Sequence, residues 1–110
     1  MTDQGKKYLS DILQAIELIE SFTDKIVTFS IYQDDLKTQS AVERQLGIIG
    51  EAINKFEKLF PTVNLDNARK IVGLRNRLIH SYDSIDSSII WAIIKNHLAP
   101  LKIEVIKLIK

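Results

Sequence analysis

The sequence predicts an all-α fold, an antiparallel bundle of four to five helices joined by short polar links. Two long segments repeat apolar residues at alternating steps of four and three, which places them on one face of a helix. The hydrophobic fraction of 45% and the charged fraction of 26% are typical of a soluble globular protein. Because 110 residues suffice for one core but not two, we expect a single domain over residues 1–110.

The first helix is predicted from residue 3 to about residue 26. Its apolar stripe consists of Tyr8, Ile12, Ala15, Ile19, Phe22 and Ile26. Thr23 and Asp24 can end this helix early, and residues 26–32 then form either a short second helix or an extended turn. The regular spacing favours a bundle core over a cofactor site.

A second long helix is predicted from about Ser40 to about Phe60. Ser40 and Glu43 have the spacing of a capping box. The apolar stripe that follows consists of Val42, Leu46, Ile49, Ile53, Phe56 and Phe60. Gly47 and Gly50 lie inside this helix, where each costs roughly 1 kcal/mol relative to alanine. We therefore expect another backbone to approach closely there.

Glu51 lies opposite this apolar stripe, on the same side as Arg44 and Lys55. One interpretation is an exposed ladder of ion pairs, which would contribute little to stability. The alternative is that Glu51 faces a partner or a functional site.

Proline and polar residues delimit the remaining helices. Pro61 ends the second long helix, and Asn64 or Asp66 can cap the next one, which should fray near Ser81. A turn follows at residues 83–84.

The last helix is predicted from Asp86 to about Ile109. Asp86 is a good N-cap, and Ile85 is placed to pack against Ile90. We expect a bend at Pro100, whose ring removes a backbone hydrogen bond. His97 lies on the apolar side of this helix, where a lone histidine is more often a satisfied core or edge residue than a catalyst. We therefore leave it out of the site.

Residues 73–86, GLRNRLIHSYDSID, combine fixed cations with a titratable base as no other segment does. On a helix, Arg75 and Tyr82 share a face near the middle of the apolar stripe, whereas Arg77 points the opposite way. His80 and Asn76, four residues apart, share a neighbouring face. A guanidinium on a buried stripe must find an anion, either a protein carboxylate or a ligand phosphate.

Arg75 and His80 together suit phosphoryl transfer at a phosphodiester. Arg75 can hold the phosphate, and His80, which titrates near neutrality, can move a proton. RNA carries its own nucleophile in the ribose 2′-hydroxyl, so strand cleavage would need no metal. The spacing alone also fits solvated side chains or helix caps.

The segment resembles the signature of HepT-type proteins of the HEPN superfamily, which is Arg, four residues, His, any residue, Tyr. Arg75, His80 and Tyr82 match it position for position. The flanking GLRNRLIH, the later IDSSIIWAII and the earlier AVERQLGIIGEA of residues 41–52 also look like the family. The likeness covers nearly the whole chain, from about residue 8 to residue 107.

The resemblance implies a HEPN-like bundle, with the motif at the end of the penultimate long helix, and a metal-independent endoribonuclease toxin without a cofactor. In that family two subunits pair so that their motifs line one shared cleft. By analogy, Arg75 binds the scissile phosphate of a messenger or transfer RNA, and His80 is the acid/base catalyst. Asn76 would orient the neighbouring groups, and Glu51, inside the similar residues 41–52, is a further supporting candidate.

Regulation is implied in the same way. Tyr82 would receive AMP from a minimal nucleotidyltransferase antitoxin of the MntA kind, which would silence the toxin. The alternative is a non-catalytic HEPN helical module that binds a nucleotidyltransferase.

Composition restricts the remaining possibilities. The absence of cysteine excludes disulfides, a thiolate nucleophile and cysteine zinc sites. The N-terminus lacks an apolar signal core, and no uncharged run approaches the ~20 residues of a membrane span, so we expect a cytoplasmic protein without membrane contact. With a net charge of +1, any RNA contact must be local. The candidate cluster is Arg69, Lys70, Arg75 and Arg77, although a solvated charged face explains Arg69 and Lys70 equally well.

Overall fold

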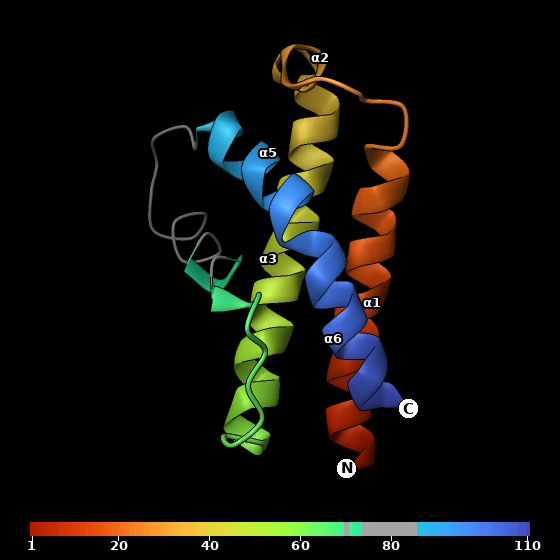
Figure 1. Ribbon diagram of the computed structural model, residues 1–110, viewed down its shortest axis with the longest axis vertical. Helices are drawn as coiled ribbons and strands as arrows, with labels where there is room; N and C mark the ends of the chain where they lie inside the picture. The colour runs from red at the N-terminus through yellow and green to blue at the C-terminus, as the bar shows by residue number, and fades with distance from the viewer. Residues whose placement is uncertain (70, 74–85) are drawn as a thin grey trace.

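The computed structural model describes residues 1–69, 71–73 and 86–110, and the regular elements in those residues are all helical (Figure 1). The all-α fold class is therefore confirmed. Five helices are described: α1 (Asp3–Phe22), α2 (Phe29–Asp34), α3 (Leu36–Leu59), α5 (Ser87–Asn96) and α6 (Leu98–Ile109).

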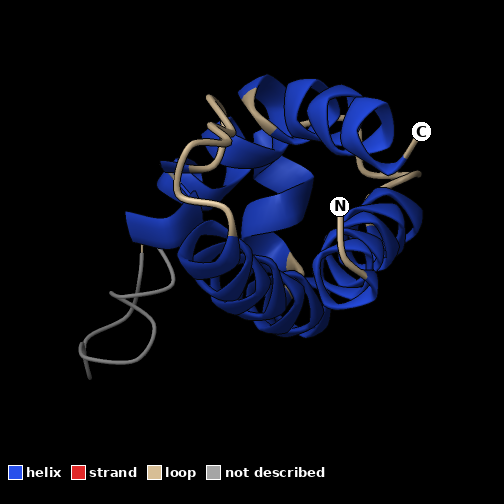
Figure 2. Cartoon of the chain, turned by 90° about the horizontal axis from the view of Figure 1, so that it is seen from below, coloured by secondary structure: helices blue, strands red, loops and turns tan. Residues whose placement is uncertain are grey.

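The long helices lie side by side, and α1 runs opposite to α3, α5 and α6 (Figure 1). In Figure 1, α1 rises from the N-terminus, α3 descends beside it, and α5 and α6 descend again, so that both chain termini lie at the same end. Helix α1 packs against both α3 and α6, while the short α2 packs against α3 and α5 at the other end. Figure 2, seen along the bundle, shows the helices end-on, with the helix at the N-terminus beside the helix at the C-terminus.

Helix α1 begins and ends where threonine side chains satisfy its free backbone groups. Oγ1 of Thr2 accepts a hydrogen bond from the N–H of Gly5 at 3.1 Å, and Oγ1 of Thr23 donates to the carbonyl of Ile19 at 2.8 Å. The predicted early break at Thr23 is confirmed. Phe22, predicted in the buried stripe, is 37% exposed, because it lies in the last turn, where the chain leaves the bundle.

The open choice at residues 26–32 resolves to a short helix, since α2 covers Phe29–Asp34. Its N-cap is Thr28, whose hydroxyl accepts from the N–H of Ile31 at 3.3 Å. Tyr32 is fully buried in this helix and anchors it to the rest of the bundle.

Helix α3 starts earlier than the predicted Ser40. Asp35 is its N-cap, with Oδ1 accepting from the N–H of Thr38 at 3.0 Å and Oδ2 from the Thr38 hydroxyl at 2.6 Å. Ser40 is an exposed residue inside the helix, so the predicted capping box with Glu43 is wrong. The helix ends at Leu59, just before Pro61, as expected.

The predicted last helix is broken at His97 rather than bent at Pro100. A proline ring clashes with the carbonyl four residues earlier, here that of Asn96, the last residue of α5. In α6 the same proline lies in the first turn, where backbone N–H groups have no acceptor within the helix, so the lack of an N–H costs no hydrogen bond. Proline thus determines the position of the break from three residues downstream.

The core is built from the apolar stripes of these helices. Its largest fully buried side chains are Tyr32, Phe56, Leu9, Ile12, Ile16, Ile19, Leu46, Ile49, Ile53, Leu65, Ile71 and Ile90. Gly50 is buried, but a Cβ added at Gly47 would meet no atom of the described residues within 4 Å, so the close backbone approach expected at Gly47 is not found among them. Among the described residues, no helix has the length and apolar character needed to cross a bilayer.

Candidate functional site

The residues predicted to carry the chemistry lie outside the described part of the chain. Arg75, Asn76, His80 and Tyr82, together with Arg77, fall within residues 74–85. The structure describes the residues directly before and after this segment, and these residues fix the positions of its two ends.

The segment that leads in returns along α3. After Phe60 the chain runs back beside that helix, and residues 69 and 71–73 are helical (Figure 1). Ala68 and Ile71 are buried and Val72 is half-buried, so the apolar residues of this stretch pack on the core.

Within the described residues, neither predicted cap forms a hydrogen bond to the first turn of this helix. The helical residues begin at Arg69, and Nδ2 of Asn64 donates to Oδ1 of Asp66 at 2.8 Å. The residue before the first helical residue is Ala68, so Asp66 and Asn64 lie two and four positions before the cap position.

A single carboxylate from α6 holds the loop in front of the motif segment. Oε2 of Glu104 accepts from the N–H of Asp66 at 2.8 Å, and Oε1 accepts from the N–H and Nδ2 of Asn67 at 3.2 and 2.6 Å. Hydrogen bonds to a charged acceptor are among the stronger ones in proteins. The loop is therefore tied to the C-terminal helix two residues before the first helical residue.

His97 extends this contact to the junction of α5 and α6. Its Nδ1 lies 3.2 Å from Oδ1 of Asn67, in reach of an N–H donor on the imidazole. The ring is half-buried. His97 is thus a hydrogen-bonded residue at the edge of the core, as its position in the sequence predicted.

The segment that leads out starts at Asp86, whose prediction as an N-cap is confirmed. Its Oδ1 accepts from the hydroxyl of Ser88 at 2.7 Å and from its N–H at 2.9 Å. These bonds, the hydroxyl first, hold the pKa of the Asp86 carboxyl below its usual range. The predicted contact of Ile85 with Ile90 involves a residue outside the described ranges.

Aromatic packing fixes α5 directly after this cap. The ring of Trp91 lies 5.3 Å from that of Tyr32 and 6.5 Å from that of Phe29, centroid to centroid. Nζ of Lys95 lies 4.5 Å from the centre of the indole, at cation–π distance. Burial, and then the carboxylates of Glu43 and Asp35, raise the pKa of Tyr32, so its phenol stays protonated.

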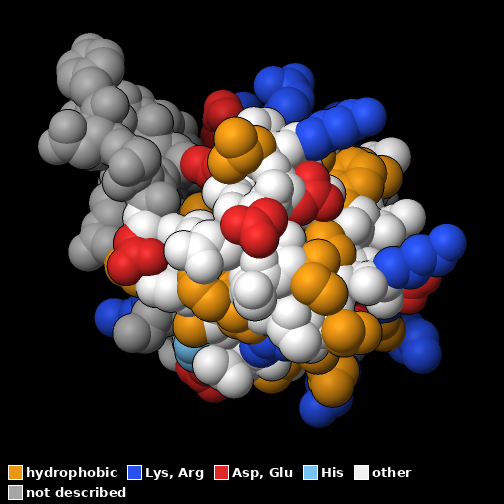
Figure 3. All heavy atoms as spheres, turned by 90° about the horizontal axis from the view of Figure 1, so that it is seen from above, with side chains coloured by type: hydrophobic (Ala, Val, Ile, Leu, Met, Phe, Trp, Pro, Cys, Tyr) orange, Lys and Arg blue, Asp and Glu red, His pale blue; other side chains and the backbone are white. Residues whose placement is uncertain are grey.

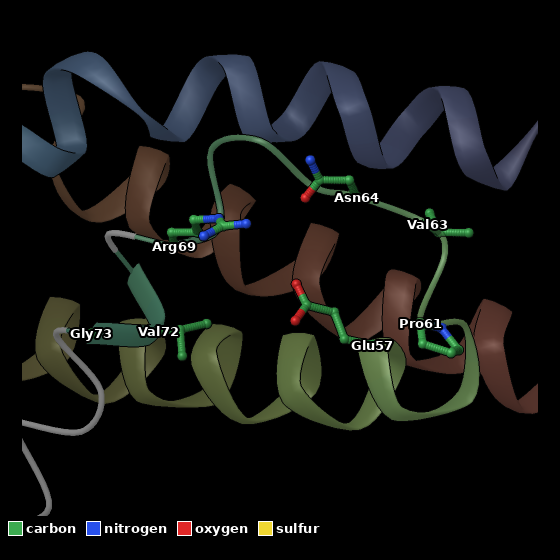
Figure 4. Close-up of a pocket in the computed structure, with 7 residues that line it drawn as sticks. All are labelled: Glu57, Pro61, Val63, Asn64, Arg69, Val72 and Gly73. Atoms are coloured by element: carbon green, nitrogen blue, oxygen red, sulfur yellow. The ribbon is translucent and has the colours of Figure 1, made fainter.

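A groove of about 770 Å³ opens beside the start of the motif segment (Figure 4). It is lined by Glu57, Pro61, Val63, Asn64, Arg69, Val72 and Gly73. The side chains of Glu57, from α3, and Arg69 extend toward each other from opposite walls. Within the described residues they form no ion pair with each other. We call this feature the Glu57–Arg69 groove.

Glu51, the other candidate, lies on the exposed side of α3. Its Oε1 is 3.3 Å from Nζ of Lys55, and both side chains are more than half exposed. The predicted ion pair is therefore confirmed. The two residues also line a small pocket of about 200 Å³ between α1 and α3, with Tyr8, Asp11, Ile48 and Ala52.

The charges of the described surface are mixed. Figure 3, seen from the end that carries α2, shows basic, acidic and apolar side chains interspersed on that face. Of the predicted basic cluster, Arg69 is exposed, while Lys70, Arg75 and Arg77 lie outside the described ranges. The described residues hold no group of three or more His, Asp or Glu side chains placed to bind a metal ion.

Comparisons with a family model and with individual known proteins agree with each other. Residues 12–108 match a family model described as "Ribonuclease HepT-like". The chain is 42% identical over 106 residues to "Probable ribonuclease HepT" of Thermococcus cleftensis, covering 93% of each chain. It is 38% identical over 104 residues to "Putative RNase MJ1380" of Methanocaldococcus jannaschii, covering 91% of this chain and 92% of that one. No solved structure gives a significant match.

Proposed function

The chain belongs to the HepT-like ribonuclease family, and from this premise we propose that it is a metal-independent endoribonuclease, the toxin of a toxin–antitoxin pair. The proposal includes a single domain over residues 1–110 that forms a homodimer in the cytoplasm and cleaves messenger or transfer RNA. Arg75 and His80 are its proposed catalytic residues, with Asn76 and Glu51 in support.

One observation carries the proposal: the spacing of Arg75, His80 and Tyr82 matches the family signature inside a region that matches the family model. Two relatives that cover more than nine tenths of this chain are themselves named as ribonucleases. The motif lies inside the region that the family model matches, and the names of the relatives point to the same activity, RNA cleavage.

The chemistry assigns each group one task. The His80 imidazole takes the proton of the ribose 2′-hydroxyl, and the oxygen attacks the adjacent phosphorus. The bond to the 5′-oxygen breaks, the His80 imidazolium gives its proton to that oxygen, and a 2′,3′-cyclic phosphate remains. Arg75 stabilises the charge that develops on the phosphate oxygens, a task that suits its fixed charge and planar fork.

The described residues support this proposal through the attachment of both ends of the motif segment. Glu104 holds the loop before it, and Asp86 caps the helix after it. Catalysis of this kind depends on groups held in position, since small displacements cost large factors in rate.

Incubation of the purified protein with total RNA, in buffer with a chelator, tests the catalytic assignment. The wild type should cleave, and His80→Ala should lose about 10²-fold or more of the rate. Arg75→Lys should fold but lose most activity, because lysine offers no planar fork. Arg44→Lys makes the same change at an exposed position of α3 and should cleave normally. Cleavage that persists in His80→Ala would reject the assignment.

We propose that Tyr82 is the point of control. AMP attached to its hydroxyl would place a phosphate near Arg75, which would occupy the anion site and block access by RNA. Tyr82→Phe, incubated with the nucleotidyltransferase and ATP, should gain no AMP mass by mass spectrometry. Tyr8→Phe removes a half-buried phenol from α1 and should be modified normally. AMP mass on Tyr82→Phe would place the modification elsewhere.

The second candidate is a non-catalytic module that binds a nucleotidyltransferase. The net charge of +1 favours it, since nucleic-acid-binding domains tend to be strongly basic. The RNA assay separates the two, because this candidate predicts no cleavage by any variant.

A further inference from the structure

We infer that the Glu57–Arg69 groove is a base-recognition subsite that prefers guanine in the nucleotide next to the cleaved bond. The inference rests on the proposed ribonuclease function and deepens it, since it concerns which RNA position is cleaved. The walls of the groove are described residues, and its reach to Arg75 follows from the spacing along the chain.

The first argument is position. Gly73 lines the groove and is separated from Arg75 by one residue. Two residue steps span at most about 7 Å. A nucleotide whose base lies in the groove can therefore place its phosphate at Arg75.

The second argument is the chemistry of the walls. Glu57 offers two acceptor oxygens, Arg69 offers fixed donors, and the two side chains point toward each other across the groove (Figure 4). Guanine carries the complementary set: N1–H and N2–H₂ are donors, while O6 and N7 are acceptors. Arginine to O6 and N7 is the commonest specific contact to guanine, and carboxylates accept from base amino groups.

The remaining bases fit this pair less well. Adenine offers one amino donor to the carboxylate and lacks the O6 acceptor, and uracil has no amino group. Cytosine offers a single amino group to the carboxylate, whereas guanine offers N1–H and N2–H₂ side by side, which fit its two oxygens. The apolar residues Pro61, Val63 and Val72 line the same groove and can contact the face of a base, while unstacked RNA bases expose their edges. Guanine therefore satisfies both charged groups best.

Cleavage of an RNA pool with a randomised segment, followed by sequencing of the ends, tests the inference. The wild type should favour bonds next to guanine over bonds next to adenine. Glu57→Gln keeps the size of the side chain but presents an amide, and should reduce this preference about 10-fold. Glu17→Gln makes the same change at an exposed position of α1 and should keep the preference. Circular dichroism checks that both variants fold.

A binding measurement makes failure of the inference distinct from failure of the nuclease proposal. GMP and AMP are titrated into the wild type and into Glu57→Gln, and binding is followed by NMR. The wild type should bind GMP at least about 5-fold more tightly than AMP, and Glu57→Gln should lose this difference. Selective GMP binding without any RNA cleavage would reject the nuclease proposal and support the subsite. Cleavage without a guanine preference, or a preference that Glu57→Gln retains, would overturn the subsite and leave the nuclease proposal standing.

Discussion

Glu104 shows how one residue far from the motif in sequence can hold the segment that leads into it. Its carboxylate accepts three hydrogen bonds from Asp66 and Asn67, which precede the motif segment by several residues. Nothing in the apolar periodicity indicates this contact, because 37 residues separate Glu104 from Asn67. Periodicity reports which face of a helix is buried, whereas a polar contact between distant segments depends on how the helices pack.

The first prediction is that Glu104→Ala destabilises the protein. Three donors lose their charged acceptor, and because the site is partly exposed, water replaces some of these bonds. We expect a loss of about 1–2 kcal/mol in the free energy of unfolding, measured by urea denaturation. Glu17→Ala removes an exposed carboxylate of α1 and should change the free energy by about 0.5 kcal/mol or less. Equal losses in the two variants would show that Glu104 does not anchor the loop.

Helix boundaries show where local sequence signals compete. Two capping signals precede the second long helix, Asp35 with Thr38 and Ser40 with Glu43, and the chain uses the earlier one. Once Asp35 starts the helix, Ser40 lies inside it. Glu43 is then partly buried, which raises the pKa of its carboxyl. The sequence supplied both signals but not the tertiary contacts of α2 that favour the first.

The second prediction concerns the pH dependence of the cap on α5. Since hydrogen bonds from Ser88 lower the pKa of Asp86 in the folded state, ionised Asp86 stabilises the fold above its unfolded pKa of about 3.9. This contribution is lost as the pH falls through the lower folded value. The unfolding free energy of the wild type should therefore exceed that of Asp86→Ala most at neutral pH, and the two should converge in acid. A difference that stays constant from pH 7 to pH 2 would contradict the assignment.

The third prediction uses two glycines with opposite surroundings. Because a Cβ at Gly47 would meet no atom of the part of the chain that the structure describes within 4 Å, Gly47→Ala should raise the free energy of unfolding by about 0.5–1 kcal/mol through better helix propensity. A Cβ at Gly5 would overlap the ring of Phe60, so Gly5→Ala should destabilise the protein. Thermal melts measure both. Destabilisation by Gly47→Ala would indicate that another surface packs closely on α3 at this position.

At the scale of the whole molecule, the sequence predicted the fold class and most of the core, because long regular stripes such as Val42 to Phe56 leave few alternatives to a bundle. It predicted the break at the end of α1 but misplaced the break before α6. Pro100 was read as the bend itself, although its ring acts on the carbonyl of Asn96. The Glu57–Arg69 groove was missed as well, since its walls come from two helices and a loop. The assignment of Arg75, His80 and Tyr82 stays a prediction.

The last prediction is a homodimer in which both motifs are needed. Arg75 falls on an apolar stripe, where a cation requires an anion, and a chain with a net charge of +1 gains local positive charge when two motif segments meet. Sedimentation at micromolar concentration should give twice the chain mass of 12.6 kDa. In equal mixtures of wild type and His80→Ala that are allowed to exchange subunits, activity should fall to about one quarter, the fraction of dimers with two intact motifs, rather than to about one half. A monomer, or activity proportional to the wild-type fraction, would show that each chain acts alone.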